Sequence, residues 1–179
     1  MSQPQQAEAE TLPPSRKGNL FGLSAEAIAG LGPLAGEPSF RARQIAHWVY
    51  GRGAEDLGTM TSVSRRLRDR LGEEWEIRRA HPVEESTVGD ESATKLLFRL
   101  EDGCLAEAVW IRDPRRETLC ISSQAGCAYG CAFCATATLK AGRNLLAGEI
   151  LSQFVAMKER ISRRSTGAAA AERDPSGTG

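Results

Sequence analysis

The chain has 179 residues, about one domain's worth of sequence, and its 41% apolar residues are enough to bury a core. Its 23 basic and 23 acidic side chains balance to a formal charge of zero, so no global field draws it onto nucleic acid, and RNA binding, if present, must come from local patches or from further sequence. The sequence has neither an apolar run near the roughly 20 residues that span a bilayer nor a signal-peptide pattern, so we expect a cytoplasmic protein that does not bind membranes.

The first part of the chain predicts a disordered leader and a small helical domain. Residues 1–18 are rich in Gln, Ala, Glu, Pro and Ser and contain almost nothing to bury. Ser24 is typical of an N-cap and opens the first of three predicted helices. The other two cover residues 40–50 and 62–71, where apolar residues recur at helical spacing. We therefore expect a helical N-terminal domain over residues 19–80.

The third predicted helix carries four arginines, Arg65, Arg66, Arg68 and Arg70. Because a guanidinium pairs bidentately with phosphate oxygens, this face could bind nucleic acid. The alternative is a solvated helix face whose charge is balanced by neighbouring acidic residues. Taken alone, the residues favour this alternative.

A β-hairpin connector is predicted over residues 81–112. Apolar and polar residues alternate over residues 94–100, Asp102 and Gly103 supply a turn, and residues 105–111 return as a second strand. The period has therefore changed from that of a helix to that of a strand.

Glu107 stands in an otherwise apolar row of the returning strand, with Leu105, Val109 and Ile111. Burial beside apolar neighbours would raise the affinity of this carboxylate for a proton and suit it to acid–base chemistry. The alternative is that Glu107 lies on the solvated face or pairs with an arginine. Without other information the residues slightly favour this alternative.

Residues 118–122 predict a short buried strand, followed by a cysteine-rich loop and then by an amphipathic helix from about Leu146. This order is the opening unit of a parallel barrel or of a doubly wound sheet, whose active sites form at the C-terminal ends of the strands. We place this unit over residues 113–162. Residues 163–179 have no apolar periodicity, which predicts a flexible tail.

Three of the five cysteines, Cys127, Cys131 and Cys134, form a C-x3-C-x2-C pattern. In a reducing compartment this spacing favours metal ligation over disulfides. Structural zinc usually needs a fourth ligand, and both histidines, His47 and His81, lie far upstream. Three thiolates suit a 4Fe-4S cluster with one iron open to a small molecule. Zinc and a chance trio of free thiols remain the alternatives.

The cysteine motif, with an aromatic residue before its last cysteine, resembles the radical S-adenosylmethionine superfamily. Its flanks are Thr118-Leu-Cys-Ile-Ser-Ser-Gln-Ala-Gly-Cys127 and Arg143-Asn-Leu-Leu-Ala-Gly-Glu-Ile150. They resemble the bacterial 23S rRNA adenine-C2 methyltransferases, some of which also modify an adenine in tRNA. The segments Phe40-Arg-Ala-Arg-Gln-Ile-Ala-His-Trp-Val-Tyr50 and Met60-Thr-Ser-Val-Ser64 resemble the small helical N-terminal domain of that family. The resemblance covers roughly residues 19–162.

The resemblance implies both cofactors and site residues. The cofactors are a 4Fe-4S cluster on Cys127, Cys131 and Cys134 and S-adenosylmethionine, for which Phe133 is a candidate contact. Cys120 matches the cysteine that resolves the protein–RNA adduct through a transient disulfide, and Glu107 matches the glutamate assigned as proton acceptor. Cys104 matches no functional position. The implied partners are 23S rRNA, tRNA and an electron donor such as a flavodoxin system.

The resemblance also implies parts that this sequence does not contain. A complete member continues through a Gly-Met-Gly-Glu-Pro segment, further barrel strands and a methyl-accepting cysteine. We therefore expect an α/β chain with a helical N-terminal domain, a β-hairpin and the first strand–helix unit of an incomplete radical-SAM (β/α) barrel. It would be a fragment, a truncated product or one half of a split enzyme, inactive without a C-terminal half. The alternatives are a small metal-stabilised nucleic-acid-binding module and an inert fragment.

Overall fold

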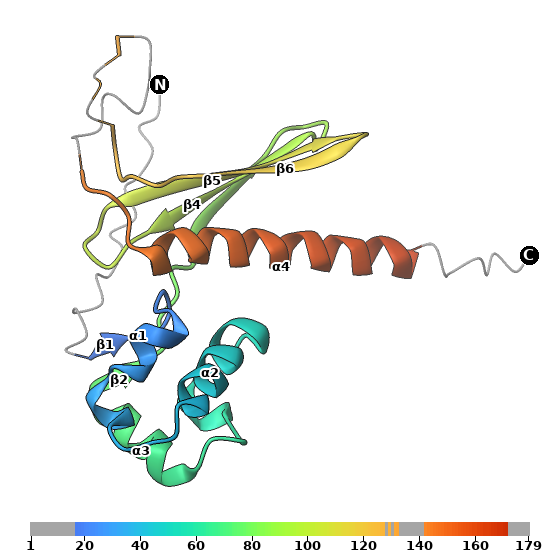
Figure 1. Cartoon of the computed structure of the whole chain (residues 1–179). Coiled ribbons are helices and arrows are strands. Elements are labelled where there is room, and N and C mark those ends of the chain that lie inside the picture. The colour runs from blue at the N-terminus through green and yellow to red at the C-terminus, as the bar shows by residue number, and fades with distance from the viewer. Residues whose placement is uncertain (1–16, 128, 130, 133–141, 172–179) are drawn as a thin grey trace, which may run out of the picture.

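The computed structural model describes residues 17–127, 129, 131–132 and 142–171, with side chains as far as Arg164. Most of the predicted leader and the end of the predicted tail lie outside these residues. The described chain forms a helical unit, a four-stranded sheet and one long helix (Figure 1). Within the described chain, none of the helices combines the length and the apolar character that a membrane span requires.

The helical unit begins as the sequence predicts. Helix α1 (Ala25–Ala29) is capped by Ser24, whose Oγ accepts from the backbone N–H of Ala27. Helix α2 (Phe40–Ala46) continues into a π-helical turn over His47–Gly51, and helix α3 (Arg65–Glu74) is capped by Ser64. The short 3-10 turns are Gly32–Leu34 and Leu57–Thr59, and strands β1 (Gly18–Asn19) and β2 (Trp75–Glu76) pair in parallel.

One apolar core holds this unit together. Each large side chain taken out of water contributes about 1.5–3 kcal/mol, so a core of this size can order short helices that would not form alone. The buried residues are Leu20, Phe21, Ile28, Leu34, Ala42, Ile45, Val49, Ala54, Met60, Val63, Leu67 and Leu71.

The sheet contains the predicted hairpin and two further strands. Its order is β3 (Pro82–Thr87), β4 (Ala93–Arg99), β5 (Leu105–Asp113) and β6 (Arg116–Ile121), and every neighbouring pair is antiparallel. The hairpin of β4 and β5 confirms the alternation read from the sequence. Strand β3 was not predicted, because its Val83, Glu84 and Glu85 do not alternate between apolar and polar.

Strand β6 differs from the strand predicted over residues 118–122. It is an edge strand of the antiparallel sheet, and it is exposed except for the half-buried Leu119. A short apolar run does not reveal whether a second strand lies on its far side. The sequence therefore placed a strand correctly but assigned it to a buried interior.

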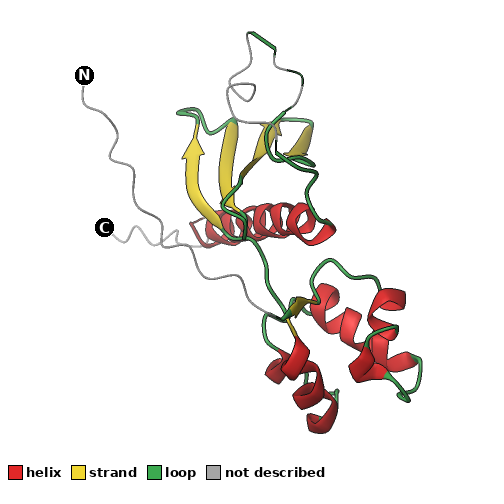
Figure 2. Cartoon of the chain, turned by 90° about the vertical axis from the view of Figure 1, so that its left-hand side faces the viewer, coloured by secondary structure: helices red, strands yellow, loops and turns green. Residues whose placement is uncertain are grey.

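Helix α4 (Ala147–Ala171) packs along one face of the sheet and lies between the sheet and the helical unit (Figures 1 and 2). Its Met157 is buried against Phe98 and Trp110, and Val155 packs against the core of the helical unit. The helix continues into the stretch from residue 163 for which the sequence predicts a flexible tail. Several alanines there favour a helix even without an apolar stripe.

The helical unit and α4 also meet through backbone. The N–H of Ala80 donates to Ser152 Oγ at 3.0 Å. Gly22, with φ +106°, lies against Gly148, where an added Cβ would come within 2.5 Å of the backbone N of Gly148. The start of α4 is thereby fixed against the helical unit on one side and the sheet on the other.

Candidate functional site

The cysteine loop leaves the sheet at the end of β6 and returns at the start of α4. Its two ends, residues 123–125 and 142–145, pair with each other, and we call them the neck. The N–H of Leu145 donates to the carbonyl of Ser123 at 2.8 Å, and the N–H of Ala125 donates to the carbonyl of Arg143 at 2.9 Å. The N–H of Gly142 donates back to the carbonyl of Ala125 at 3.0 Å. The neck closes the loop at its base.

A glycine is required where the two ends of the neck cross. A Cβ added to Gly142 would lie 2.2 Å from the carbonyl oxygen of Ala125, closer than any side chain can approach. On the other end Gly126 has φ +72°, a left-handed conformation that glycine adopts without strain. The glycines beside the cysteine motif therefore serve the turn and the close approach.

The start of the neck is fastened to α4 by a buried amide. Gln153 is fully buried. Its Oε1 accepts from the N–H of Ser122 at 2.8 Å, and its Nε2 donates to the carbonyl of Ser122 at 2.9 Å. Gln153 thus binds both the N–H and the carbonyl of Ser122, the residue between β6 and the neck.

The end of the neck is fastened by Arg143. Its guanidinium donates to Asp102 Oδ2 in the β4–β5 turn at 2.7 Å and to both carboxylate oxygens of Glu149 at 2.7 Å. Burial opposes ionisation of Asp102, but the hydrogen bonds from Arg143 and from the N–H of Cys104 outweigh it and lower the pKa of Asp102. These contacts join the neck to the sheet and to the first turn of α4.

The predicted ligands lie beyond this neck. Cys127 is half-buried and Cys131 exposed, and both are free thiols. Cys134 and the candidate cofactor contact Phe133 lie outside the described residues, so the set of three thiolates stays a prediction. Among the residues that the structure describes, no three His, Cys, Asp or Glu side chains are grouped for a metal ion.

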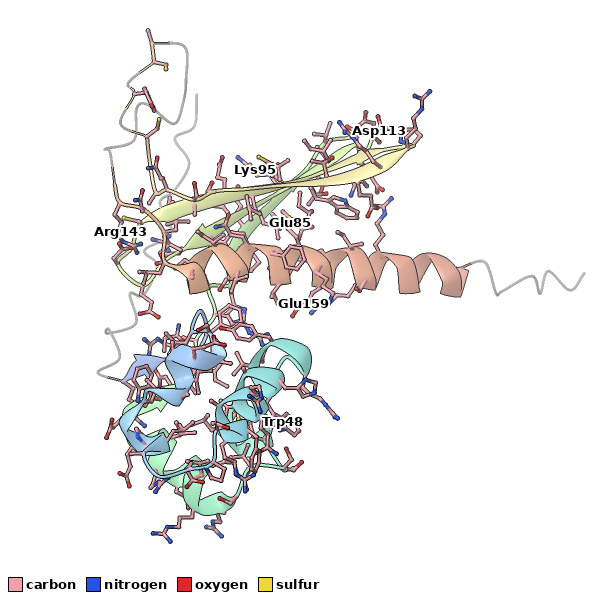
Figure 3. All side chains as sticks on the ribbon, viewed as in Figure 1. Trp48, Glu85, Lys95, Asp113, Arg143 and Glu159 are labelled. Carbon is pink, nitrogen blue, oxygen red and sulfur yellow. The ribbon has the colours of Figure 1, made fainter. Side chains whose placement is uncertain are left out.

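Glu107 and Cys120 lie on one face of the sheet, the face turned away from α4. Cys120 pairs with Val109, which pairs on its other side with Lys95, so the three form a row across β6, β5 and β4. Glu107 is two residues from Val109, which makes it a diagonal neighbour of Cys120, at about 7–8 Å between Cα atoms in such pairs. Figure 3 shows Lys95 on this face.

Glu107 lies in the predicted row with Leu105, Val109 and Ile111, but this row faces solvent. Its side chain is 50% exposed and its Oε1 accepts from Lys95 Nζ at 3.0 Å. Leu105 and Ile111 on the same face are exposed as well. The burial beside apolar neighbours that would suit acid–base chemistry is therefore not found at Glu107. The solvated, ion-paired alternative, which the residues alone slightly favour, describes it, with lysine in place of arginine.

The backbone carbonyl of Glu107 accepts from Ser122 Oγ at 2.7 Å. Because Gln153 holds the backbone of Ser122, Glu107 lies where β6 passes into the neck. Cys120 is a free, exposed thiol two residues earlier on β6. Two candidate catalytic side chains and the start of the cysteine loop thus come together at one end of the sheet.

Cys104 and the arginines of α3 are the remaining residues considered from the sequence, and their contacts lie within the protein. Burial and the neighbouring Asp102 carboxylate raise the pKa of the Cys104 thiol, which disfavours the reactive thiolate. In α3, Arg70 binds Glu37 and the carbonyl of Pro33, and Arg68 donates to the carbonyl of Gly58. These internal contacts favour a structural role for Arg68 and Arg70. The exposed Arg65 pairs with Asp69, as the alternative of a solvated, charge-balanced helix face predicts.

Sequence reasoning missed Gln153 and Arg143 as site residues. Arg143 was noted only as part of a resembling segment, and Gln153 looks like any polar residue of an amphipathic helix. A polar residue at a core-facing position of α4, where Met157 follows four residues later, is the one signal that could have found Gln153.

Comparison with known proteins identifies relatives over most of the chain. Residues 18–77 match the family described as the ribosomal RNA large subunit methyltransferase N-terminal domain. A protein of Rhodopseudomonas palustris (strain BisB18), called dual-specificity RNA methyltransferase RlmN, is 39% identical over 163 residues, covering 86% of this chain and 41% of the relative. The protein of that name from Rhodospirillum rubrum is 45% identical over 141 residues, covering 79% of this chain and 33% of the relative.

A solved structure shares the fold. The crystal structure of a radical SAM methyltransferase from Sphaerobacter thermophilus superposes with a TM-score of 0.69 at 38% identity, covering 82% of this chain and 43% of that one. The chain spans about two fifths or less of the length of these curated relatives. From the family match, the identities and the shared fold, the chain belongs to the RlmN family and corresponds to its N-terminal portion.

Proposed function

We propose that the chain is the N-terminal portion of a radical S-adenosylmethionine enzyme that methylates carbon 2 of an adenine in 23S rRNA, with tRNA as a second substrate. One observation carries this proposal: β6 presents Cys120 beside Glu107 and then leads, through a neck held by the protein's own side chains, into the loop with Cys127 and Cys131. The family membership supports the same chemistry.

The donor set suits an iron–sulfur cluster. Cys127 and Cys131 are free thiols on a loop whose base is closed, and Cys134 follows three residues later in the sequence. Three thiolates leave one coordination position of a 4Fe-4S cluster open, and the cluster would supply the electron that cleaves S-adenosylmethionine there. In this proposal Phe133 contacts the bound S-adenosylmethionine, and a flavodoxin-type protein delivers the electron.

Glu107 and Cys120 would act on the RNA side of the site. The ion pair with Lys95 holds the carboxylate of Glu107 at the sheet surface, where it can accept a proton from the adenine ring. The thiol of Cys120 would release the methylated RNA by forming a disulfide with the methyl-carrying cysteine of a C-terminal portion. Their diagonal placement across β5 and β6 lets both side chains reach one base.

The test is methyl transfer by a completed enzyme. The chain is fused to the remaining C-terminal portion of the Rhodopseudomonas palustris relative, reconstituted anaerobically, and given labelled S-adenosylmethionine and protein-free 23S rRNA or tRNA. We expect label at carbon 2 of adenine from the fusion and none from the 179 residues alone, because the relatives are more than twice as long. Turnover by the 179 residues alone would overturn the assignment of essential groups.

Variants of the fusion separate the roles. Cys127→Ala should retain no iron and transfer no methyl group. Cys120→Ala should retain iron but release no product, and Glu107→Gln should slow transfer by about 10²–10⁴-fold, the usual contribution of a general base. Cys104→Ala is the matched control and should retain both iron and activity, since no role is assigned to that thiol. Full activity in the Cys120 variant would contradict its role.

A further inference from the structure

Arg143 joins three separate segments of the chain. Its Nε donates to Asp102 in the β4–β5 turn, and Nη1 and Nη2 donate to the two oxygens of Glu149 in the first turn of α4, each at 2.7 Å. Nη1 also donates to the carbonyl of Asn144 in the neck at 3.1 Å. Glu149 in turn accepts from the N–H of Leu146 at 2.7 Å, which caps the start of α4. Bidentate pairing of this kind fixes orientation as well as distance.

The neck requires such a clamp. Its main-chain pairing is only a few residues long, and an isolated two-stranded ribbon of that length is not stable in water. Its hydrogen bonds must also offset the entropy lost when the loop between the two ends is closed. Gln153 fixes the start of the neck. At its end Leu145 is buried with Leu100 and Ala106, and Asn144 Oδ1 accepts from Gln124 Nε2 at 2.8 Å across the neck. Arg143 is the charged side chain that ties this end to the β4–β5 turn and to α4.

We propose that Arg143 is a positioning residue for the cysteine loop: it closes the neck before any metal group binds, and the closed neck slows release of the group that the cysteines hold. The second half of this statement rests on the proposed function. The first half does not, because the closed neck consists only of the protein's own hydrogen bonds. Residues of this kind, which orient metal ligands without touching the metal, typically change metal affinity by about 10–100-fold when they are mutated.

The chain offers a control on helix α4, which Arg143 contacts through Glu149. Arg160 of α4 forms an ion pair with Glu85 of β3, and the side-chain exposures of 40% and 36% resemble the 38% and 39% of Arg143 and Asp102. Arg160 lies more than three turns of helix beyond Glu149, away from the neck. Removing it breaks one ion pair of similar exposure between α4 and the sheet and leaves the neck intact.

The experiment compares the 179-residue chain with Arg143→Ala, Arg143→Lys and Arg160→Ala. Hydrogen exchange of the metal-free proteins is followed at the N–H groups of Ala125, Gly142 and Leu145, which donate across the neck. The proteins are then loaded with iron and sulfide anaerobically, and the loss of visible absorbance to an iron chelator is timed. Urea unfolding of each protein reports global stability.

We expect Arg143→Ala to exchange the three neck amides at least about tenfold faster, and to lose iron about 10–100-fold faster, than the unmodified chain. Arg143→Lys should lie between, because lysine reaches one carboxylate but not the bidentate geometry. Arg160→Ala should match the unmodified chain in both measurements, and its urea midpoint should shift less than that of Arg143→Ala, because Arg160 makes one ion pair and Arg143 a bidentate pair and two further hydrogen bonds.

Two results would overturn the proposal. One is a metal-free chain whose neck amides exchange freely. The other is an Arg143→Ala variant that matches Arg160→Ala in amide exchange or, once loaded, in iron release. If the unmodified chain binds no iron at all, the proposed function fails and with it the effect on release. The amide exchange then still decides whether Arg143 closes the neck.

Discussion

Gln153 is a polar side chain in the contact between α4 and the sheet. It is fully buried, and both ends of its amide bind the backbone of Ser122, while Nε2 also donates to the carbonyl of Glu149 at 3.3 Å. A buried amide is tolerated only when its donors and acceptors are satisfied. Here the same bonds that satisfy Gln153 also satisfy the residue leading into the neck.

Replacing Gln153 by leucine should therefore destabilise the chain although leucine is more apolar. The N–H and carbonyl of Ser122 lose their partners in a half-buried position, at a cost of about 1–3 kcal/mol. Urea unfolding measures the loss. Gln124→Leu is the control, because Gln124 is exposed and makes one side-chain hydrogen bond, to Asn144, so its change should stay within about 0.5 kcal/mol. Equal losses would show that the buried amide has no special role.

At the scale of single residues, the sequence predicts the features that depend only on neighbours a few positions away along the chain. The cysteine pattern, the cap at Ser24 and the alternation around Glu107 are all read within a few residues. For Glu107 the sequence only slightly favours the solvated alternative over burial, since its surroundings depend on what lies against the outer face of the sheet. The contacts of Gln153 and Arg143 join segments up to 41 residues apart, so no local pattern reveals them.

Among the helices and strands, too, those with a regular local pattern were predicted, and what depends on distant parts of the chain was missed. Helix α3 and the β4–β5 hairpin were predicted because each buries a regular stripe of side chains. Strand β3 was missed because it lies at the sheet edge. Its Glu84 and Glu85 are exposed there, so the strand lacks the apolar alternation of a half-buried strand. The antiparallel pairing of β6 with β5 was missed because pairing partners are chosen by the whole sheet rather than by the strand.

The start of α4 provides a prediction about elements. A Cβ added to Gly148 would lie 2.5 Å from the carbonyl oxygen of Phe21, which belongs to the helical unit. Alanine normally favours a helix over glycine by about 1 kcal/mol, yet Gly148→Ala should destabilise this chain by about 1–3 kcal/mol because the two units must separate. Thermal unfolding gives the sign of the change directly.

Gly89→Ala is the matched control for this substitution. Gly89 has no atom within 4 Å of an added Cβ and no positive φ, so alanine there should be neutral or slightly stabilising. A stabilised Gly148→Ala variant would mean that the contact with Phe21 yields easily and does not fix α4 to the helical unit.

At the scale of the whole molecule, three apolar clusters contact helix α4: the core of the helical unit, the sheet interior around Met157, and a smaller cluster under the neck, against which Ile150 packs. The core of the helical unit is drawn entirely from residues 20–71, and Val155 of α4 is its one contact from beyond residue 80 among the apolar side chains described. The sheet is covered by Met157, Ala156 and Ile161 of the same helix. The helical unit therefore depends little on the rest of the chain, whereas the sheet depends on α4 for its interior.

This asymmetry predicts that residues 17–80 fold alone. The fragment keeps its complete buried core, its two caps and the contacts of Arg79, whose guanidinium lies 5.0 Å from the ring centroid of Phe21. It loses the packing of Val155 and the bond from Ala80 to Ser152, so its melting temperature should fall by several degrees, at about 4–8 °C per kcal/mol for a domain of this size. We expect helical circular dichroism and one cooperative thermal transition.

Leu67→Ala, which empties a fully buried site at a cost of about 2–5 kcal/mol, should abolish that transition in so small a unit. A fragment with random-coil circular dichroism, or one that melts identically with and without Leu67, would show that this core is not self-sufficient and that α4 is needed to hold both halves of the molecule.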